Sequence, residues 1–273
     1  MKLALVNRQV ILPESGTESF QCHASTLVRL PCGTLVAAWF AGLCEGSEDT
    51  AIWLSRYEHN IWTTPQRVVA REGEAHWNPV LFYPSDKLWL FYKVGSGVHV
   101  WKTWFITSSD RGFTWSTPAP LVNGDILPRG PVKNKLLLAS NGAWIAPGSI
   151  ESPERWRAFV DRSSDEGKHW NISFVPLEPD NAISGTNVAL WDGIKKGCCG
   201  NVVWKTSCAG MALFSLRCGS LLQGISICCY EAHAGQFFAV IQSTMALPGL
   251  LPARHLYRII IVVSIWLVCR TVR

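Results

Sequence analysis

The chain has 273 residues, enough for one large domain or two small ones. Hydrophobic residues make up 48% of it and 14 residues are Trp, a composition that excludes an intrinsically disordered protein. The net charge of +5 is unevenly spread, because residues 1–197 are neutral overall whereas residues 198–273 contain a single acid, Glu231. Seven of the 10 cysteines also lie in the second region. We therefore predict two regions of different origin, and no nucleic-acid partner for the neutral one.

The N-terminal apolar run before Arg8 is too short for a secretory signal peptide. We therefore expect a cytoplasmic chain with reduced thiols. Residues 259–269 form a run of 11 residues that are apolar except for Ser264, but a membrane-spanning helix needs about 20 apolar residues. The expectation here is a buried strand or an aggregation-prone segment, and no membrane span. The adjacent cysteine pairs of the tail lack the spacing of zinc ligands, so we predict neither a metal nor another cofactor.

Three groups of short β-rich segments follow one another along the first region, separated by Gly and Pro. The expected strands are residues 25–30, 34–41, 50–55 and 68–70, then 79–83, 88–94, 103–107 and 121–122, then 135–139, 143–146, 157–160 and 172–175. This spacing excludes a helical repeat. Four strands in each group favour an all-β fold of the propeller type, with four-stranded blades around an axis.

A turn motif repeats after the third strand of each group. Residues 108–115 have the sequence SSDRGFTW, residues 163–170 have SSDEGKHW, and residues 55–62 keep the Ser and Trp of a third, altered copy. A period near 50 residues is typical of a repeat fold. The Asp can accept backbone hydrogen bonds in a turn, the Gly permits positive φ and the Trp provides a large apolar face. We therefore assign a structural role to Ser108, Asp110, Gly112, Trp115, Ser163, Asp165, Gly167 and Trp170.

The repeated turn resembles the Asp box, or BNR repeat, of sialidases and their relatives. Further blocks resemble the BNR-repeat sialidase-like family of plants and bacteria, and they cover residues 1 to about 196. The blocks are residues 22–27 (CHASTL), 39–42 (WFAG), 49–53 (DTAIW), 76–80 (HWNPV), 91–95 (FYKVG) and 130–135 (GPVKNK).

The resemblance implies a six-bladed propeller whose site lies at the axial end away from the Asp boxes. Three blades are recognisable in the sequence, and residues 187–191 could begin a fourth. We therefore expect an incomplete propeller of about three to four blades in residues 1–197. Residues 198–273 are expected to form an unrelated tail, as replacement by unrelated coding sequence would produce. Open blade edges also predict self-association.

The resemblance points to two candidate catalytic residues in the first blade. Sialidases carry an acid/base Asp in the loop after the second strand of that blade, where this chain offers Asp49 as the best match and Glu45 as the second. From composition alone, the same loop is a solvated acidic segment. The first arginine of the sialidase carboxylate clamp is replaced here by His23, and an imidazole is a poorer partner for a carboxylate. This replacement argues against sialic acid as the substrate.

Further polar side chains could line a sugar pocket. His76, Trp77 and Asn78 precede a strand and could stack on or hydrogen-bond a sugar, although Trp77 fits a core position equally well. The cations and amide at Lys93, Lys133, Asn134 and Lys135 are either contacts for an anionic sugar or solvated strand ends, and Glu151 is a further candidate carboxylate.

Two functions remain open from the sequence. One is a sialidase-like glycoside hydrolase that acts on a terminal, anionic sugar of a small or oligosaccharide substrate. The other is a non-catalytic carbohydrate-binding or remnant propeller.

Overall fold

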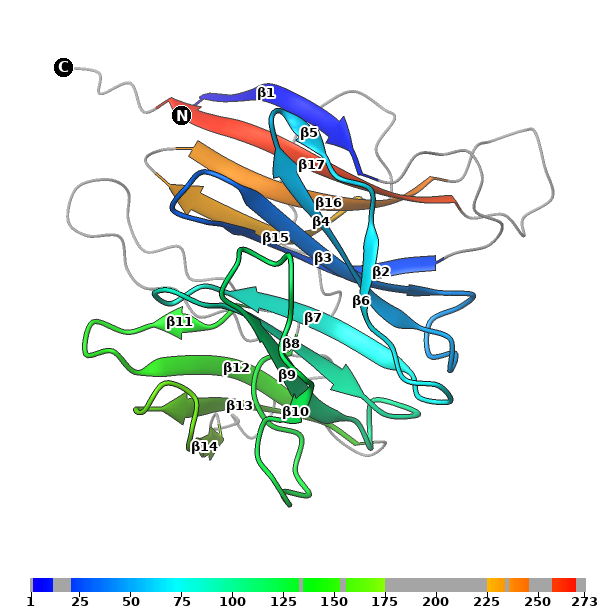
Figure 1. Ribbon diagram of the computed structural model, residues 1–273, viewed down its shortest axis with the longest axis vertical. Coiled ribbons are helices and arrows are strands. Elements are labelled where there is room, and N and C mark those ends of the chain that lie inside the picture. The colour runs from blue at the N-terminus through cyan, green and yellow to red at the C-terminus, as the bar shows by residue number, and fades with distance from the viewer. Residues whose placement is uncertain are drawn as a thin grey trace, which may run out of the picture.

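The computed structural model describes residues 2–11, 21–132, 135–152, 156–174, 225–233, 236–245 and 257–268. Within these residues every regular element is a β-strand, and the strands form four antiparallel sheets (Figure 1). None of the described segments forms a helix long and apolar enough to cross a membrane.

Three of the sheets follow the three sequence groups and are called blades 1, 2 and 3. Blade 1 contains β2 (Gln21–Arg29), β3 (Leu35–Gly42), β4 (Ala51–Glu58) and β5 (Ile61–Trp62), with β6 (Gln66–Val69) also paired to β4. Blade 2 contains β7 (His76–Phe82), β8 (Leu88–Val94), β9 (Lys102–Ser108) and β10 (Ala119–Pro120). Blade 3 contains β11 (Leu137–Leu138), β12 (Trp144–Glu151), β13 (Trp156–Ser163) and β14 (Asn171–Phe174).

The outer strand of blade 2 differs from the prediction. It lies at Ala119–Pro120 and not at residues 121–122. The Leu121 N–H donates to the Thr103 carbonyl (2.9 Å), so one further hydrogen bond to β9 follows the end of the strand at Pro120. Pro120 has no N–H and therefore shortens the paired segment.

The fourth sheet, called the terminal sheet, joins the first strand of the chain to the last three. Its order is β1 (Lys2–Val10), β17 (Tyr257–Val268), β16 (Gln236–Met245) and β15 (Ile225–His233). The register between β1 and β17 runs from Lys2 opposite Val268 to Val10 opposite Ile261. In Figure 1 the blue β1 lies beside the red β17, at the opposite side of the molecule from blade 3. The terminal sheet packs against β2 of blade 1.

The strand pairings of the terminal sheet concern the tail predicted for residues 198–273. Most of the apolar run at residues 259–269 lies in β17, so a strand is present there as expected. The strands of residues 225–268 form a sheet with β1, while the boundary at residue 197 stays a prediction. Residues 187–191, where a further blade was suggested, lie outside the described residues.

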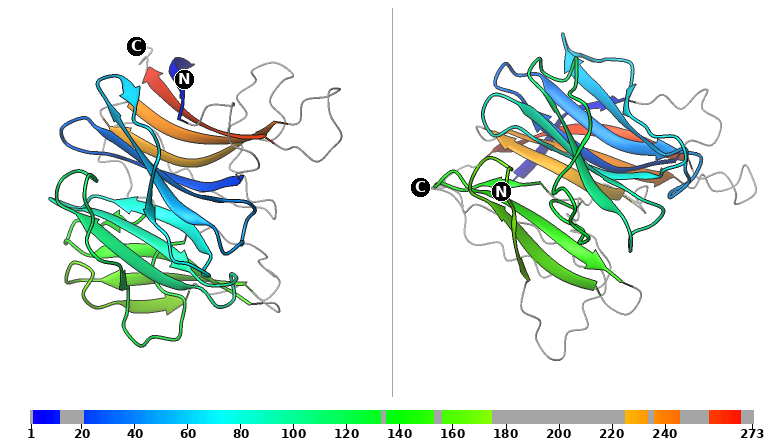
Figure 2. Two further views of the ribbon diagram at one scale, coloured as in Figure 1. Left: turned by 45° about the vertical axis from the view of Figure 1, so that its right-hand side comes forward. Right: turned by 60° about the horizontal axis from the view of Figure 1, so that its bottom comes forward.

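Each blade has two distinct ends. In blade 2, His76 pairs with Val94 and Val94 pairs with Lys102, so the start of the first strand and the link between the second and third strands share one end. We call this the loop end. The repeated Ser-x-Asp-x-Gly turns begin at Ser108 and Ser163, at the opposite end of their blades, which we call the box end. Figure 2 shows the same sheets from two further directions.

The two complete turns at the box end are closed by their own side chains. The Asp110 carboxylate accepts the N–H groups of Phe113 (3.0 Å) and Thr114 (2.9 Å) and the Thr114 hydroxyl (2.6 Å). These bonds hold the pKa of Asp110 well below its usual range, and the hydrogen bond from the Thr114 hydroxyl has the largest effect. Gly112 has a φ of 86°, and its carbonyl accepts a bond from Arg56 of blade 1 (3.0 Å). The turn therefore fixes the conformation of the connection that follows β9, and its Gly112 carbonyl bonds this connection to blade 1.

The second turn repeats this chemistry with one change. Asp165 accepts the His169 N–H (2.9 Å), and its other oxygen lies 2.5 Å from the His169 Nδ1. The Ser163 hydroxyl lies 2.9 Å from Asp165 and accepts the Gly167 N–H (2.8 Å). His169 thus takes the place that Thr114 has in blade 2.

The contacts between blades differ in character. The blade 1–2 interface is a large apolar core. Its members include Val36, Phe40, Ile52, Leu54, Trp77, Leu81, Leu90, Tyr92, Val94 and Trp101. The blade 2–3 interface is apolar near the box end, where its members include Phe82, Phe91, Trp144 and Trp170. The same interface contains the buried polar side chains of Lys93 and Thr103, near the loop end of blade 2, and those of Arg129 and Asp161.

Candidate functional site at the loop end of blades 1 and 2

The first strands of blades 1 and 2 are both distorted near the loop end. The pairing of β2 shifts register between His23 and Thr26, and that of β7 shifts between Trp77 and Val80. Within these bulges Ala24 has a φ of 48° and Asn78 a φ of 41°. Positive φ is uncommon outside glycine and, together with bulges, occurs often at functional sites, because it re-aims neighbouring side chains. β2 and β7 pack against each other, so the two bulges mark one region.

His23 and Glu45 meet in this region. The His23 Nδ1 lies 3.5 Å from the Glu45 carboxylate, and the imidazole stacks on Phe40 with ring centroids 5.2 Å apart and planes 13° apart. The Glu45 N–H donates to the side-chain oxygen of Gln21 (3.2 Å). The His23 side chain is 11% exposed and that of Glu45 is 54% exposed. The buried His23 imidazole therefore contacts the Glu45 carboxylate, which remains accessible to solvent.

Asp49 lies in the same loop but is engaged differently. Its carboxylate accepts the Leu43 N–H (2.9 Å) and the Ser47 hydroxyl. The hydrogen bond from Ser47 lowers the pKa of Asp49 below its ordinary value, and the Leu43 N–H acts in the same direction. In this structure Asp49 shapes the loop that presents Glu45.

The Trp77 ring packs against the loop that carries Glu45 and Gly46. The Gly46 backbone has a φ of 86°, and a Cβ there would lie 2.8 Å from the Trp77 ring. The ring lies 5.9 Å from Phe40 and 5.8 Å from Trp101 between centroids, and its N–H donates to the Gly95 carbonyl (2.8 Å). Trp77 is only 8% exposed, so it is part of the blade 1–2 core, as one of the two alternatives predicted.

His76 is also buried beneath the loop. Its backbone N–H donates to the Thr50 hydroxyl (2.8 Å). The ring nitrogen Nδ1 lies 3.1 Å from the Thr50 carbonyl oxygen and 2.8 Å from the Glu74 carbonyl oxygen. Because both neighbours of Nδ1 are acceptors, that nitrogen carries the proton. Burial lowers the pKa of His76, so the ring is neutral at pH 7. Asn78, on the same strand, is 4% exposed.

Two of the remaining predicted residues lie at another interface. Lys93 and Glu151 are buried at the loop end of the blade 2–3 interface, where Glu151 accepts a bond from the Ser149 hydroxyl (2.8 Å). Lys135 is half-buried. Lys133 and Asn134 lie outside the described residues.

Sequence reasoning missed the ion pair between Arg129 and Asp161. The guanidinium donates to both carboxylate oxygens (2.8 and 2.9 Å) and also to the Trp170 carbonyl (2.6 Å). Asp161 is fully buried, and burial raises its pKa against the opposite influence of the Gly130 N–H and of Arg129. The signal was weak, because Asp161 directly follows the predicted strand of residues 157–160. In the structure it lies within β13, and aspartate is depleted in strands.

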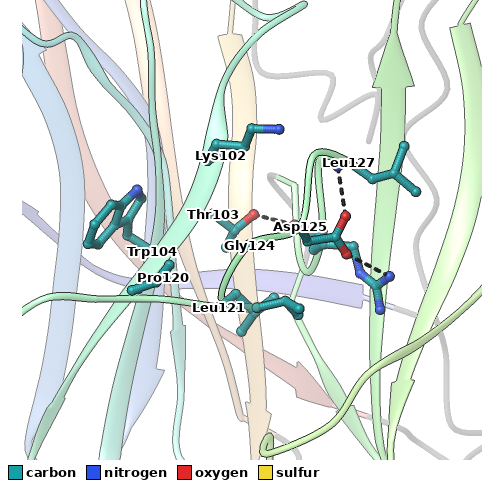
Figure 3. A pocket seen from close by; sticks show the side chains of 10 residues that line it. Lys102, Thr103, Trp104, Pro120, Leu121, Gly124, Asp125 and Leu127 are labelled. Carbon is teal, nitrogen blue, oxygen red and sulfur yellow. Dashed lines mark hydrogen bonds and ion pairs between the residues drawn. The ribbon is translucent and has the colours of Figure 1, made fainter.

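A small pocket of about 110 Å³ lies beside this ion pair (Figure 3). Its wall includes Lys102, Trp104 and Leu121 as well as Asp125 and Arg129. Asp125 accepts bonds from Arg129 (3.2 Å) and from the Leu127 N–H (2.8 Å), so its carboxylate is already engaged. The described residues contain no group of His, Cys, Asp and Glu side chains suited to a metal ion.

Residues 33–202 match the BNR repeat-like domain family. The chain belongs to this family. A protein of unknown function from Dyadobacter fermentans has a similar structure, with 13% identity, a TM-score of 0.54 and coverage of 88% of this chain and 66% of that chain. Alpha-L-arabinanase from Penicillium chrysogenum (14%, TM-score 0.48, 89% and 63%) and sialidase from Trypanosoma rangeli (13%, TM-score 0.44, 82% and 34%) also align. A search of curated proteins found no match.

The predicted family and fold are thereby confirmed: this BNR-repeat chain is an all-β protein with a sialidase-like propeller fold. It spans about two thirds or less of the length of these three structures. Against the six blades of the resemblance, the described residues form four sheets. At identities this low, the structural likeness concerns the fold alone.

Proposed function

We propose that this BNR-repeat chain is a glycoside hydrolase that acts on a terminal sugar at the loop end of blades 1 and 2. The observation that carries the proposal is the His23–Glu45 pair, which places a solvent-accessible carboxylate on a buried imidazole, between two distorted strands. The family resemblance of the surrounding blocks supports the same region.

Glu45 is the proposed acid/base, and Asp49 is the residue that positions its loop. In this role the Glu45 carboxyl donates a proton to the glycosidic oxygen. His23, beside it, is the group proposed to face the negative group of the sugar. The substrate class proposed is therefore a terminal anionic sugar other than sialic acid.

A second function, sugar binding without hydrolysis, is favoured by one observation. Hydrolysis needs a group on the opposite face of the sugar ring as well as an acid. Glu151, the other carboxylate that we predicted for this site, is buried in the blade 2–3 interface.

The test is hydrolysis of a panel of aryl glycosides with neutral and anionic terminal sugars, combined with calorimetric binding of the free sugars. Glu45→Gln is expected to lower kcat/KM at least about 100-fold, as loss of a general acid does. Asp86→Asn changes an exposed carboxylate in the β7–β8 connection, at the box end, and should leave activity unchanged. Asp49→Asn should act mainly on KM through the loop.

Each outcome separates the two functions. Hydrolysis that survives Glu45→Gln removes Glu45 from the mechanism. Binding that is lost in His23→Ala, without any hydrolysis by the original chain, establishes the binding protein. Neither hydrolysis nor binding rejects both proposals.

A further inference from the structure

Lys93 occupies an unusual place for a lysine, because it is fully buried between blades 2 and 3. It lies on β8, and its Nζ donates to the Thr103 hydroxyl (2.5 Å) and to the Arg129 carbonyl (2.6 Å). Within the described part of the chain these two oxygens are its hydrogen-bond acceptors. A neutral amine has two N–H donors and is fully satisfied by them, whereas an ammonium has three.

The charged groups that face Lys93 come from three other segments. Asp161 lies on β13, Glu151 ends β12, and Arg129 lies in the segment that leads from β10 to β11. The Arg129 side chain is paired with Asp161, and Glu151 is bonded to the Ser149 hydroxyl. The His99 ring, from the loop between β8 and β9, contacts the Glu151 carbonyl. Both carboxylates attract a protonated Lys93, while burial opposes its charge.

The net result of these effects is a lower proton affinity of the Lys93 amine in the closed state. Burial lowers the pKa of Lys93 from 10.5 to about 7, although Asp161 and Glu151 act in the opposite direction. An amine that becomes exposed when the blades separate regains the ordinary pKa of lysine. Between about pH 7 and 10.5 the separated state therefore binds more protons than the closed state, so protons favour separation.

We propose that Lys93 is a proton-sensitive lock between blades 2 and 3, which loosens their contact when its amine takes up a proton. Arg129 connects the two blades in this contact. Its carbonyl accepts hydrogen bonds from the Lys93 amine and the Thr103 hydroxyl of blade 2, and its guanidinium donates to the Asp161 carboxylate of blade 3. The segment of residues 121–130 over this interface loosens together with blade 3. The apolar blade 1–2 interface does not respond.

The test is hydrogen exchange of the whole chain, followed by mass spectrometry at pH 7 and pH 9 and corrected for intrinsic exchange rates. Protection of the β12 and β13 peptides should rise on the order of 10- to 50-fold between these pH values, as expected for one proton per opening. Protection of the β3 and β4 peptides should stay constant. Lys93→Met should abolish the difference, and Lys87→Met, at an exposed lysine of blade 2, should retain it.

Two results would overturn the proposal. One is an equal pH response of both interfaces, and the other is a response that persists in Lys93→Met. A second measurement covers the case in which Lys93→Met does not fold. Nuclear magnetic resonance titration of the lysine side chains in the unaltered protein should find one amine that titrates near pH 7, and titration of every lysine above pH 9 would refute the lock.

Discussion

The two faces of strand β8 show how differently neighbouring blades are held together. Leu88, Leu90, Tyr92 and Val94 face blade 1 and join an apolar core. Phe91 faces blade 3 within a smaller apolar cluster, and Lys93 points into its charged end. An apolar contact is non-directional and tolerates small shifts, whereas buried charges depend on every partner being in place. The blade 1–2 interface therefore provides cohesion, and the blade 2–3 interface provides a fixed alignment.

The largest expected effect comes from removing one side of the buried ion pair. Asp161→Ala leaves the Arg129 guanidinium buried without its carboxylate, which should lower the free energy of unfolding by about 3–5 kcal/mol. Guanidinium denaturation followed by Trp fluorescence measures the change. Glu72→Ala, at an exposed carboxylate, is the matched control. A loss in Asp161→Ala no larger than in the control would show that Arg129 is satisfied without Asp161.

The apolar face of the same strand should respond to volume and not to pH. Leu90→Ala removes a fully buried side chain from the blade 1–2 interface and should cost about 3 kcal/mol, through lost burial and the cavity left behind. The loss should be the same at pH 7 and pH 9. A loss that changes by more than about 1 kcal/mol between these pH values would contradict the division of β8 into two kinds of interface.

A smaller effect should follow from loss of one hydrogen bond in the charged interface. Thr103→Val keeps the shape of the side chain but removes the hydroxyl that accepts a bond from Lys93, at an expected cost of about 1–2 kcal/mol. Thr107→Val, on the same strand, is the control. If both variants unfold at the same denaturant concentration, the Lys93–Thr103 bond contributes nothing measurable.

The strands and the turns of the box end were predictable because their causes are local. Asp110 and the N–H groups that it accepts lie within four residues of each other, so the turn is written in one short motif. The nearly continuous run of apolar and aromatic residues likewise locates β8 without knowledge of its neighbours. These features identify the architecture, but they lie at the opposite end of the blades from the candidate site.

The contacts at the loop end could not be predicted in the same way. Arg129 and Asp161 are 32 residues apart, and their pairing depends on how two blades face each other. Lys93 was predicted at a strand end in contact with solvent or a sugar, because lysine is rarely buried, and only the neighbouring blade covers it. Asp49 was chosen by its position in the loop, and its hydrogen bonds to Leu43 and Ser47 could not be read from that position.

The pairing of β1 with β17 has a consequence for biosynthesis. During translation β1 emerges well before its partner β17, which follows roughly ten to fifty seconds later at 5–20 residues per second. Until then β1 presents unpaired backbone groups, a template for pairing with other chains. The nascent protein therefore depends on protection of β1 until β17 leaves the ribosome, and any truncation before residue 257 leaves β1 permanently without its partner.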